Sequence, residues 1–556
     1  MKYLCTIAAL CFAAPAMAQV APRPAVPDAT HVLAPSAGTY TAPPVAPVEQ
    51  HLALPAPRAG CLRFTAVRII GARAVPQADI AAQFTSLENR DITAADLKPA
   101  LDAINALYAG AGLPLGRAIV PAQRLKNGVL TVRIVEGFIE TVTVKTDNEQ
   151  TKALAENLAA PLKAERPLTR ATLERVMLLL QEIPGITLSS AFEAMNPQTG
   201  GTRLVINAHI RPVTLGISLD NRSGAGGMPV LPYLTAEFDN LLGWGDQVAL
   251  TALLSPRQQD YAFYGFDLSR LVGPYGSRLG MEGFWAQVLD TVSLRPYAVR
   301  SQSTRLSVHA SHPLLRSTGE SLDASARLFY AGAQYSLAGV ASPVFARDRF
   351  LALEVGLDYR RMFSSTLAAG GNLRLTQGLL GLADAPHTRA GAIDGFTRVR
   401  AEGKFIWQPL ADITLNLSAQ GQWSPDSLFA SQEVAFGGAA YGRGFQAAEI
   451  SGDRGIGLSF QPEYRIAPEP AWSISPYLLA DYARAVNRRG DLQPDAELVS
   501  AGAGLKFAAG ELATVTLEAA KPINRVPLDR RDRSWRFYAG LELGMDQALS
   551  VIAGSL

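Results

Sequence analysis

Residues 413–423 read ITLNLSAQGQW, a stretch in which apolar and polar side chains alternate almost one by one. Residues 456–466 (IGLSFQPEYRI) and 535–545 (WRFYAGLELGM) show the same period of two. In a β-strand this period places the apolar side chains on one face and the polar side chains on the other. Strands of about 9–11 residues with one apolar face are typical of membrane-spanning β-barrels, whose interior is polar.

The alternation begins near residue 213 and continues to residue 545, and turn residues interrupt it at intervals along this region. Dividing the region at these turns predicts about sixteen strands, centred near residues 216, 235, 250, 265, 283, 305, 326, 354, 376, 402, 418, 461, 480, 502, 516 and 540. We therefore predict an all-β antiparallel transmembrane barrel over residues 213–545, followed by a tail over residues 546–556. A soluble β-sandwich or propeller is disfavoured, because soluble strands usually run nearer about 5–6 residues.

Residues 61–212 contain the helical patterns, which fall into two units of one plan, residues 61–137 and 138–212. Each unit reads as a strand, a helix and two closing strands, and a threonine precedes each helix as its expected N-cap, Thr93 and Thr169. Pro99 lies inside the first expected helix and should weaken or bend it. These patterns predict two small α+β domains in front of the barrel, each large enough to fold on its own.

The N-terminal segment predicts export from the cytoplasm. An apolar core at residues 4–14 (LCTIAALCFAA) is followed by the small-residue cleavage site Ala16-Met17-Ala18, so residues 1–18 are expected to be a secretory signal peptide. Residues 19–60 hold nine prolines and few charges, which predicts an extended tether. Cleavage leaves Cys61 as the single cysteine, which excludes an intramolecular disulfide framework.

Composition and motifs exclude several function classes. The chain carries 51 Lys and Arg against 49 Asp and Glu without a basic stripe, so no nucleic-acid partner is expected. After the signal, no charge-free apolar stretch reaches eighteen residues, so no transmembrane helix is expected. The sequence lacks the Walker A, G-x-S-x-G and H-E-x-x-H motifs, so we expect no enzyme activity and no cofactor. His309 and His312 should point to opposite faces of a strand, so no metal site is expected.

Several motifs resemble those of a known family. They are Val135-Glu136-Gly137 at the end of the first unit, Ile183-Pro184-Gly185 in the second, and Asn240-Leu241-Leu242-Gly243-Trp244-Gly245-Asp246 at an early turn of the barrel. The two units resemble POTRA domains, and the whole order resembles the two-partner secretion transporters (TpsB) of the ShlB/FhaC/HecB type, which include haemolysin activators. The resemblance spans most of residues 61–545. It implies the outer membrane of a Gram-negative cell, with both POTRA domains in the periplasm.

The longest well-defined gap between predicted strands, residues 424–454, carries the most specific motif. Its glycine-rich segments are Gly442-Arg443-Gly444-Phe445 and, after these, Gly452-Asp453. In the family that the chain resembles, the equivalent loop folds back into the barrel, and its tip arginine meets an acidic residue of the inner wall. The resemblance therefore implies that Arg443 lies at the tip and that Asp481 is its partner. Glycines on both sides of Arg443 are suited to a tight reversal of the backbone.

The strand pattern around Asp481 supports this pairing independently. Asp481 shares a strand face with Ser475 and Tyr477, whereas Leu478 and Tyr482 lie on the other face. Asp481 is therefore predicted to point into the barrel lumen, where a charge needs a partner or water.

The resemblance implies an outer-membrane translocase that secretes a large partner exoprotein of the haemolysin or adhesin type. The POTRA domains would bind the unfolded client, loop 424–454 would gate the barrel, and folding of the client outside would drive export. An insertase of the BamA/TamA kind and a passive porin are the alternatives.

Further partners are expected from the position of the chain in the membrane. Arg530, Arg531 and Arg533 precede the last strand in an outer loop and are expected to contact lipopolysaccharide beside the membrane lipid. The barrel-assembly machinery should act on the chain during its biogenesis. We expect the protein to be a monomer.

Overall fold

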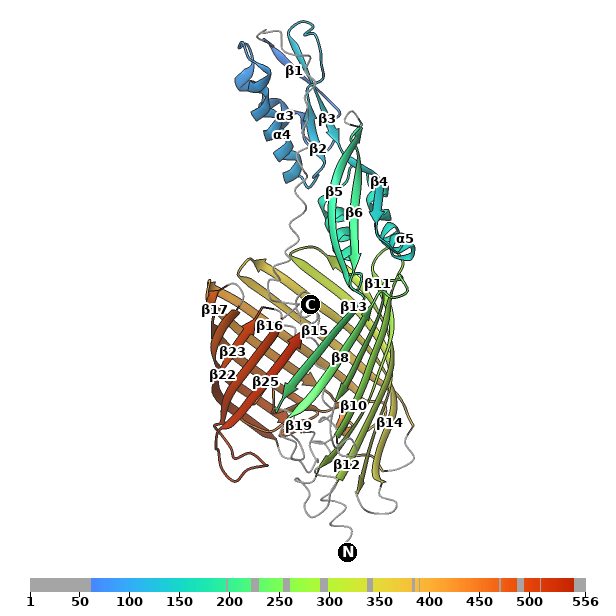
Figure 1. Ribbon diagram of the computed structural model, residues 1–556, viewed down its shortest axis with the longest axis vertical. Coiled ribbons are helices and arrows are strands. Elements are labelled where there is room, and N and C mark those ends of the chain that lie inside the picture. Colours follow the sequence, from blue (N-terminus) through green and yellow to red (C-terminus); the bar gives the residue numbers. More distant parts are fainter. Residues whose placement is uncertain are drawn as a thin grey trace, which may run out of the picture.

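The computed structural model describes residues 62–196, 199–221, 230–253, 261–290, 299–337, 344–382, 386–389, 391–469, 472–487, 495–510 and 512–544. Two small α/β units follow one another at one end of a β-barrel (Figure 1). The expected signal peptide, the tether, Cys61 and the tail lie outside the described residues. Among the described residues, none of the helices combines the length and the apolar character needed to cross a bilayer.

The first unit is a three-stranded sheet covered by helices. Its elements are β1 (Ala66–Ile70), α3 (Gln77–Ala82), the 3-10 helices η1 (Thr85–Leu87) and η2 (Ala94–Leu97), α4 (Lys98–Gly110), β2 (Gly116–Ile119) and β3 (Val129–Glu136). The sheet has the order β1-β3-β2, with β1 parallel and β2 antiparallel to the central β3. Tyr108 of α4 and Leu130 of β3 are buried in one core between the helices and the sheet.

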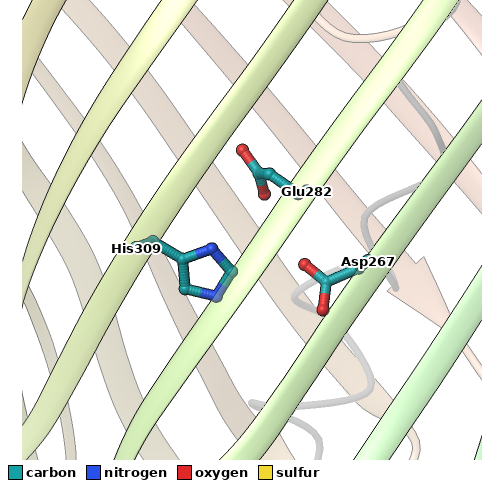
Figure 2. Close-up of side chains that lie close together, drawn as sticks. All are labelled: Asp267, Glu282 and His309. Atoms are coloured by element: carbon teal, nitrogen blue, oxygen red, sulfur yellow. The ribbon is translucent and has the colours of Figure 1, made fainter.

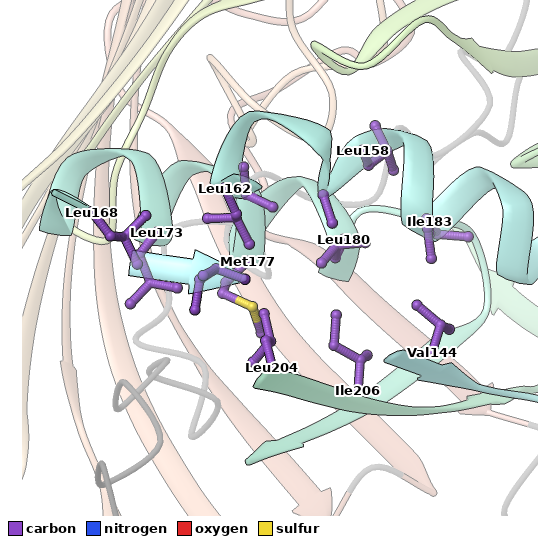
Figure 3. Packing of buried hydrophobic residues seen from close by; sticks show 14 of the residues in the cluster. Val144, Leu158, Leu162, Leu168, Leu173, Met177, Leu180, Ile183, Leu204 and Ile206 are labelled. Carbon is purple, nitrogen blue, oxygen red and sulfur yellow. The ribbon is translucent and has the colours of Figure 1, made fainter. Parts of the chain in front are cut away.

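The second unit repeats this topology. Its elements are β4 (Phe138–Lys145), α5 (Glu149–Leu158), α6 (Ala160–Ala164), α7 (Arg170–Gln181), β5 (Ile186–Asn196) and β6 (Gly201–Ile210). The order is β4-β6-β5, again with one parallel and one antiparallel neighbour of the central strand. Figure 3 shows Leu173, Met177 and Leu180 of α7 facing Leu204 and Ile206 of β6, which is the packing that holds the unit together.

Two details of the predicted helices are settled by the structure. Thr169 caps α7 by accepting a hydrogen bond from the backbone N–H of Thr172 at 3.2 Å. Thr93 is instead the N-cap of the short η2 and shares a capping box with Asp96. The expectation that Pro99 bends the first helix is wrong, because α4 begins only at Lys98 and Pro99 occupies its first turn. The N–H that proline lacks has no partner in a first turn, so the helix tolerates it there.

The remaining strands form the barrel. They are β7 (Val213–Asp220), β8 (Leu231–Asp239), β9 (Asp246–Leu253), β10 (Tyr261–Val272), β11 (Ser277–Asp290), β12 (Val299–Arg316), β13 (Glu320–Leu337), β14 (Val344–Ser364), β15 (Leu367–Gly381), β16 (Thr397–Leu410), β17 (Ile413–Trp423), β20 (Arg454–Tyr464), β21 (Ile466–Glu469), β22 (Trp472–Val486), β23 (Ala496–Ala509), β24 (Ala513–Pro522) and β25 (Arg536–Gly544). Each pairs antiparallel with its neighbour, and β25 pairs with β7 to close the ring. With β20 and β21 counted as one strand interrupted at Arg465, the described residues form sixteen strands, and the predicted fold class is confirmed.

The predicted strand length is too short for part of the wall. β12 and β13 have 18 residues each and β14 has 21, against the roughly 9–11 residues typical of membrane-spanning strands. About 9–11 residues suffice to cross the bilayer, so these strands continue past the membrane, and Figure 1 shows them extending furthest from the two α/β units. The sequence pattern could not reveal where these strands leave the membrane, because the alternation is the same inside the membrane and beyond it.

The two faces of the wall differ as the alternation predicts. On β22, Leu478 is 62% exposed on the outside, whereas its neighbours Tyr477 and Leu479 are buried on the inside. On β25, Phe537 is exposed and Tyr538 is buried in the same way. The outward apolar side chains suit lipid, and the inner face is left to polar and aromatic groups.

The second unit is docked on the barrel. Arg316 at the end of β12 forms an ion pair with Glu182 after α7, with Nε to Oε1 at 2.5 Å. Asn240, in the turn after β8, donates a hydrogen bond from its amide to the Thr151 hydroxyl at 3.0 Å. Leu271 of β10 is buried within the hydrophobic core of the second unit. On the expectation that both units lie in the periplasm, the turns that contact this unit lie at the periplasmic rim, and the opposite rim faces outward.

Candidate functional site

The long loop between β17 and β20 lies in the barrel. β17 ends at Trp423 and β20 begins at Arg454, so residues 424–453 form what we call the lumenal loop. The loop contains the 3-10 helix η4 (Ala430–Gln432) and a hairpin of β18 (Val434–Phe436) and β19 (Ile450–Gly452). Figure 1 shows β19 within the outline of the barrel. Residues 437–449, between the two hairpin strands, form the tip.

The backbone of the tip depends on glycine. Gly437, Gly438 and Gly442 have φ angles of 110°, 86° and 93°, which residues with a β-carbon rarely adopt. Gly444 lacks a positive φ, and its role is different from the predicted one. A β-carbon at Gly444 would lie 2.6 Å from the carbonyl carbon of Lys521, so this glycine allows the tip to approach the wall closely.

The structure brings Arg443 and Asp481 together inside the barrel. The backbone N–H and Nε of Arg443 donate to Oδ2 of Asp481 at 2.9 and 3.1 Å, and Nη2 donates to Oδ1 at 2.9 Å. Arg443 is 5% exposed and Asp481 is 3% exposed. The hydroxyls of Ser459 and Ser500 also donate to this carboxylate, at 2.8 and 3.1 Å. The two charges are thus paired and hydrogen-bonded, as burial of charge requires.

A second carboxylate, which the sequence reasoning missed, completes the pocket of Arg443. Glu518 of β24 lies 3.4 Å from Nη1 and accepts a hydrogen bond from the Tyr477 hydroxyl at 2.8 Å. Gln461 of β20 accepts a hydrogen bond from the same Nη1 at 2.8 Å. Glu518 could have been found from the alternation of β24. Thr514, Thr516 and Glu518 alternate with apolar residues such as Leu517, which is exposed on the outer face.

The tip is also held by the last strand and by apolar packing. The Tyr538 hydroxyl donates to the carbonyl oxygen of Arg443 at 2.8 Å, and Nε of Arg536 donates to that of Gly444 at 2.9 Å. Phe445 is fully buried in a cluster that includes Phe436 of the loop and Leu498 of β23. Strands β20, β22, β23, β24 and β25 all contribute, so the tip rests on one continuous side of the lumen.

The other sequence-predicted residues, Gly452 and Asp453, lie where the loop meets the wall. A β-carbon at Gly452 would lie 2.8 Å from the carbonyl oxygen of Val486, so glycine fits this close approach. Asp453 forms a buried bidentate pair with Arg389 of the outer segment between β15 and β16, at 2.5 and 3.0 Å. Sequence reasoning did not identify Arg389, because its segment has no alternation or motif.

Three potential metal ligands lie elsewhere on the inner wall. Asp267, Glu282 and His309 come from the adjacent strands β10, β11 and β12, and their ligand atoms lie within 4.8 Å of one another (Figure 2). His312 does not belong to this group and contacts the Ser277 hydroxyl at 2.8 Å. Arg327 already neutralises Glu282, with Nε to Oε1 at 3.2 Å, so we assign this group no metal.

Comparison with known protein families gives two matches along the chain. Residues 200–507 match the haemolysin secretion/activation protein family ShlB/FhaC/HecB. Residues 62–137 match the POTRA domain of the ShlB type. The first match covers more than half of the chain and includes the lumenal loop together with Asp481.

Similar proteins agree with this assignment. The heme/hemopexin transporter protein HuxB of Haemophilus influenzae strain 86-028NP is 20% identical over 471 residues, covering 80% of both chains. The outer membrane transporter CdiB of Dickeya dadantii is 24% identical over 425 residues, covering 74% of this chain and 73% of its own.

Among solved structures, CdiB from Escherichia coli shares the fold, with a TM-score of 0.66 and 18% identity over 87% of this chain and 90% of that one. BamA from Haemophilus ducreyi, lacking POTRA domains 1–3, has a TM-score of 0.54 at 12% identity, covering 86% of this chain and 100% of that one. The predicted family is therefore confirmed: the chain belongs to the ShlB/FhaC/HecB family, the outer-membrane two-partner secretion transporters that export a partner exoprotein.

Proposed function

We propose that the two α/β units bind the unfolded client in the periplasm and that the lumenal loop gates its passage through the barrel. The observation that carries this proposal is the buried pair of Arg443 and Asp481, which holds the tip inside the lumen. Removing one partner of such a pair leaves an uncompensated buried charge, whereas moving the tip into water solvates both charges together. The loop can therefore hold a closed state firmly and still release it reversibly.

We propose that residues 138–212 form a second POTRA domain and that its strand β5 offers the client an edge. β5 is an outer strand of its sheet, and its 11 residues make it the longest strand of the two units in the described residues. An extended client segment can add to such an edge through main-chain hydrogen bonds, with little demand on its sequence. This unit contacts the periplasmic turns directly, so a client bound there lies beside the barrel entrance.

We propose that folding of the client outside the cell supplies the driving force, since the sequence offers no nucleotide-binding motif. Arg531 and Arg533 are exposed in the outer loop between β24 and β25, where they are suited to contact anionic lipopolysaccharide. We further propose a monomer that the barrel-assembly machinery inserts into the outer membrane.

Substitution of the buried pair tests the gate. Arg443→Ala and Asp481→Ala should each cut export of the client severely, because the loop loses its defined position in the lumen while the wall keeps its strand pairing. The measurement is the amount of client in the medium relative to the amount of heat-modifiable, folded barrel in the outer membrane. Arg531→Ala, an exposed arginine of an outer loop, is the matched control and should export normally.

The same experiment separates the rival functions. Normal export from both Arg443→Ala and Asp481→Ala would contradict the gate, and a changed pore conductance alone would then favour a porin. Comparing medium and outer membrane with and without the gene identifies the client as a protein lost from the medium. Depletion of several other barrels from the outer membrane would instead indicate an insertase.

A further inference from the structure

The root of the lumenal loop, which is the loop outside its tip (residues 424–436 and 450–453), has its own buried ionic anchor where it meets the outer part of the wall. Nη1 and Nη2 of Arg389 donate to the two oxygens of Asp453 at 2.5 and 3.0 Å, and Nη1 lies 2.9 Å from Oε1 of Glu433. Nη1 also donates to the carbonyl oxygen of Leu428 at 3.2 Å, and Nη2 to Oδ1 of Asn487 at 3.1 Å. One arginine thus joins both ends of the loop to the outer segment and to the end of β22.

Apolar packing fixes the same region. The ring of Phe429 stacks on Phe350 of β14 with centroids 4.7 Å apart and planes inclined by 8°, and it meets Phe396 edge-on. All three rings are fully buried. The backbone N–H of Ile393 donates to the carbonyl oxygen of Ser427 at 3.2 Å, which ties the outer segment directly to the start of the loop.

The connection from the root to the tip is of a different kind. Gly437 and Gly438 follow β18, both with positive φ, so the backbone here can change direction without steric cost from a β-carbon. Beyond them, Arg443 is held by Asp481 together with groups that water can replace, such as the amide of Gln461 and the hydroxyl of Ser459. Movement about a few such residues next to a rigid segment is the usual geometry of a hinge.

We propose that the lumenal loop opens by displacement of its tip, residues 437–449, while its root stays fixed to the outer wall, and that Arg389 is the positioning residue of this root. The inference rests on the proposed gating function and adds to it which part of the loop moves. A fixed root keeps the tip close to its pocket, so Arg443 can return to Asp481 after the client has passed.

A disulfide staple across the root tests the proposal. The hydrogen bond between Ile393 and Ser427 brings their backbones close enough for a disulfide, so the pair Ile393→Cys and Ser427→Cys is made in a Cys61→Ser background. Neither side chain belongs to the ionic anchors. The staple, verified by mobility after oxidation, should leave export of the client unchanged. Export that stops on oxidation and returns on reduction would overturn the proposal, because the root would then have to move.

A second variant gives a positive readout. Arg389→Met removes the positive charge that Asp453 and Glu433 share, so the root should loosen and pore conductance should rise several-fold. Oxidising the staple in the Arg389→Met background should lower the conductance again, and Arg389→Lys should leak less than Arg389→Met. An unchanged conductance in folded Arg389→Met would contradict the positioning role.

The two proposals fail in different ways. Normal export from Arg443→Ala and Asp481→Ala removes the gate itself, whatever the staple does. If those variants lose export and the stapled protein also loses it, gating stands and the fixed root is wrong.

Discussion

At the scale of single residues, the pocket of Arg443 explains why this arginine is not interchangeable with lysine. Its guanidinium contacts Asp481, Gln461, Ser459 and Glu518, which lie in different directions and belong to three strands. A planar group with five donors can satisfy such a set, whereas an ammonium ion cannot reach all of it at once. Breaking one member of a buried pair costs on the order of 3–5 kcal/mol, so the closed position of the tip is well defined.

The close approach of Gly444 to the wall can be tested by a single substitution. In Gly444→Ala the new methyl group would lie 2.6 Å from backbone atoms of Lys521 and Pro522, and backbone cannot rotate away as a side chain can. The strain, about 1–3 kcal/mol for overpacking, should displace the tip, reduce export and raise pore conductance. Both quantities are measured against the amount of folded barrel.

Gly421→Ala is the matched control for this prediction, because nothing lies within 4 Å of a β-carbon at Gly421. It should behave as the unmodified protein. Gly444→Ala protein with normal conductance and export would show that the close approach at Lys521 has no part in holding the tip.

At the scale of elements, the contact of α7 with the barrel positions the second unit. Arg316 contacts Glu182 with both Nε and Nη2, and Nη2 of Arg278 donates to the backbone oxygen of Glu182 at 2.5 Å. The Arg175 guanidinium donates to the carbonyl oxygen of Pro313 at 2.8 Å. These contacts join the end of α7 to β11 and β12, so the second unit and the periplasmic rim should move as one body.

Glu182→Ala tests this docking. The variant leaves the partly buried Arg316 with Asp323 alone, so the second unit should rock on the rim and present the client less accurately to the entrance. Export should fall, and spin-label distances between the unit and the rim should broaden. Asp102→Ala is the control, since its pair with Lys98 lies in the first unit and is exposed, and such surface pairs contribute only about 0–1 kcal/mol. Unchanged distance distributions in Glu182→Ala would contradict the rigid docking.

In the molecule as a whole, the barrel closes where β25 pairs with β7, which we call the seam. Within the described residues, β25 and β7 are joined over five residue pairs, whereas β24 and β25 are joined over eight. A client that crosses inside the lumen does not need this seam to open. The seam therefore distinguishes passage through the barrel from lateral release into the membrane.

A disulfide across the seam tests the route. Ser218 and Glu542 are direct partners in the register, so Ser218→Cys with Glu542→Cys in a Cys61→Ser background should form a bridge on oxidation. Export of the client is expected to continue at its normal rate in the bridged protein, measured before and after reduction. Export that resumes only after reduction would indicate that the wall opens. The same bridge between Thr516 and Gly540, partners on the longer β24–β25 pairing, is the control.

The barrel could be predicted from the residues alone because the alternation of apolar and polar side chains is a local signal. Alternation within each strand reports which face meets lipid, and each predicted strand centre falls within an observed strand. The inward direction of Asp481 followed from the same alternation. One helix of each unit, α4 and α7, was predicted because its apolar spacing is local as well, whereas α3, α5 and α6 were not predicted. Pro99 was misjudged because the exact start of a helix depends on tertiary packing.

Apart from Arg443 and Asp481, whose pairing the family resemblance implied, the lumenal contacts became visible only in the three-dimensional fold. Arg443 approaches Glu518 across 75 positions of sequence, and Arg389 approaches Asp453 across 64, through contacts that depend on the curvature of the closed wall. Alternation says that Glu518 faces inward but not which charge lies opposite. A buried charge needs a partner. Which partner it has depends on how the closed ring of strands brings distant residues together, and the local alternation carries no information about that arrangement.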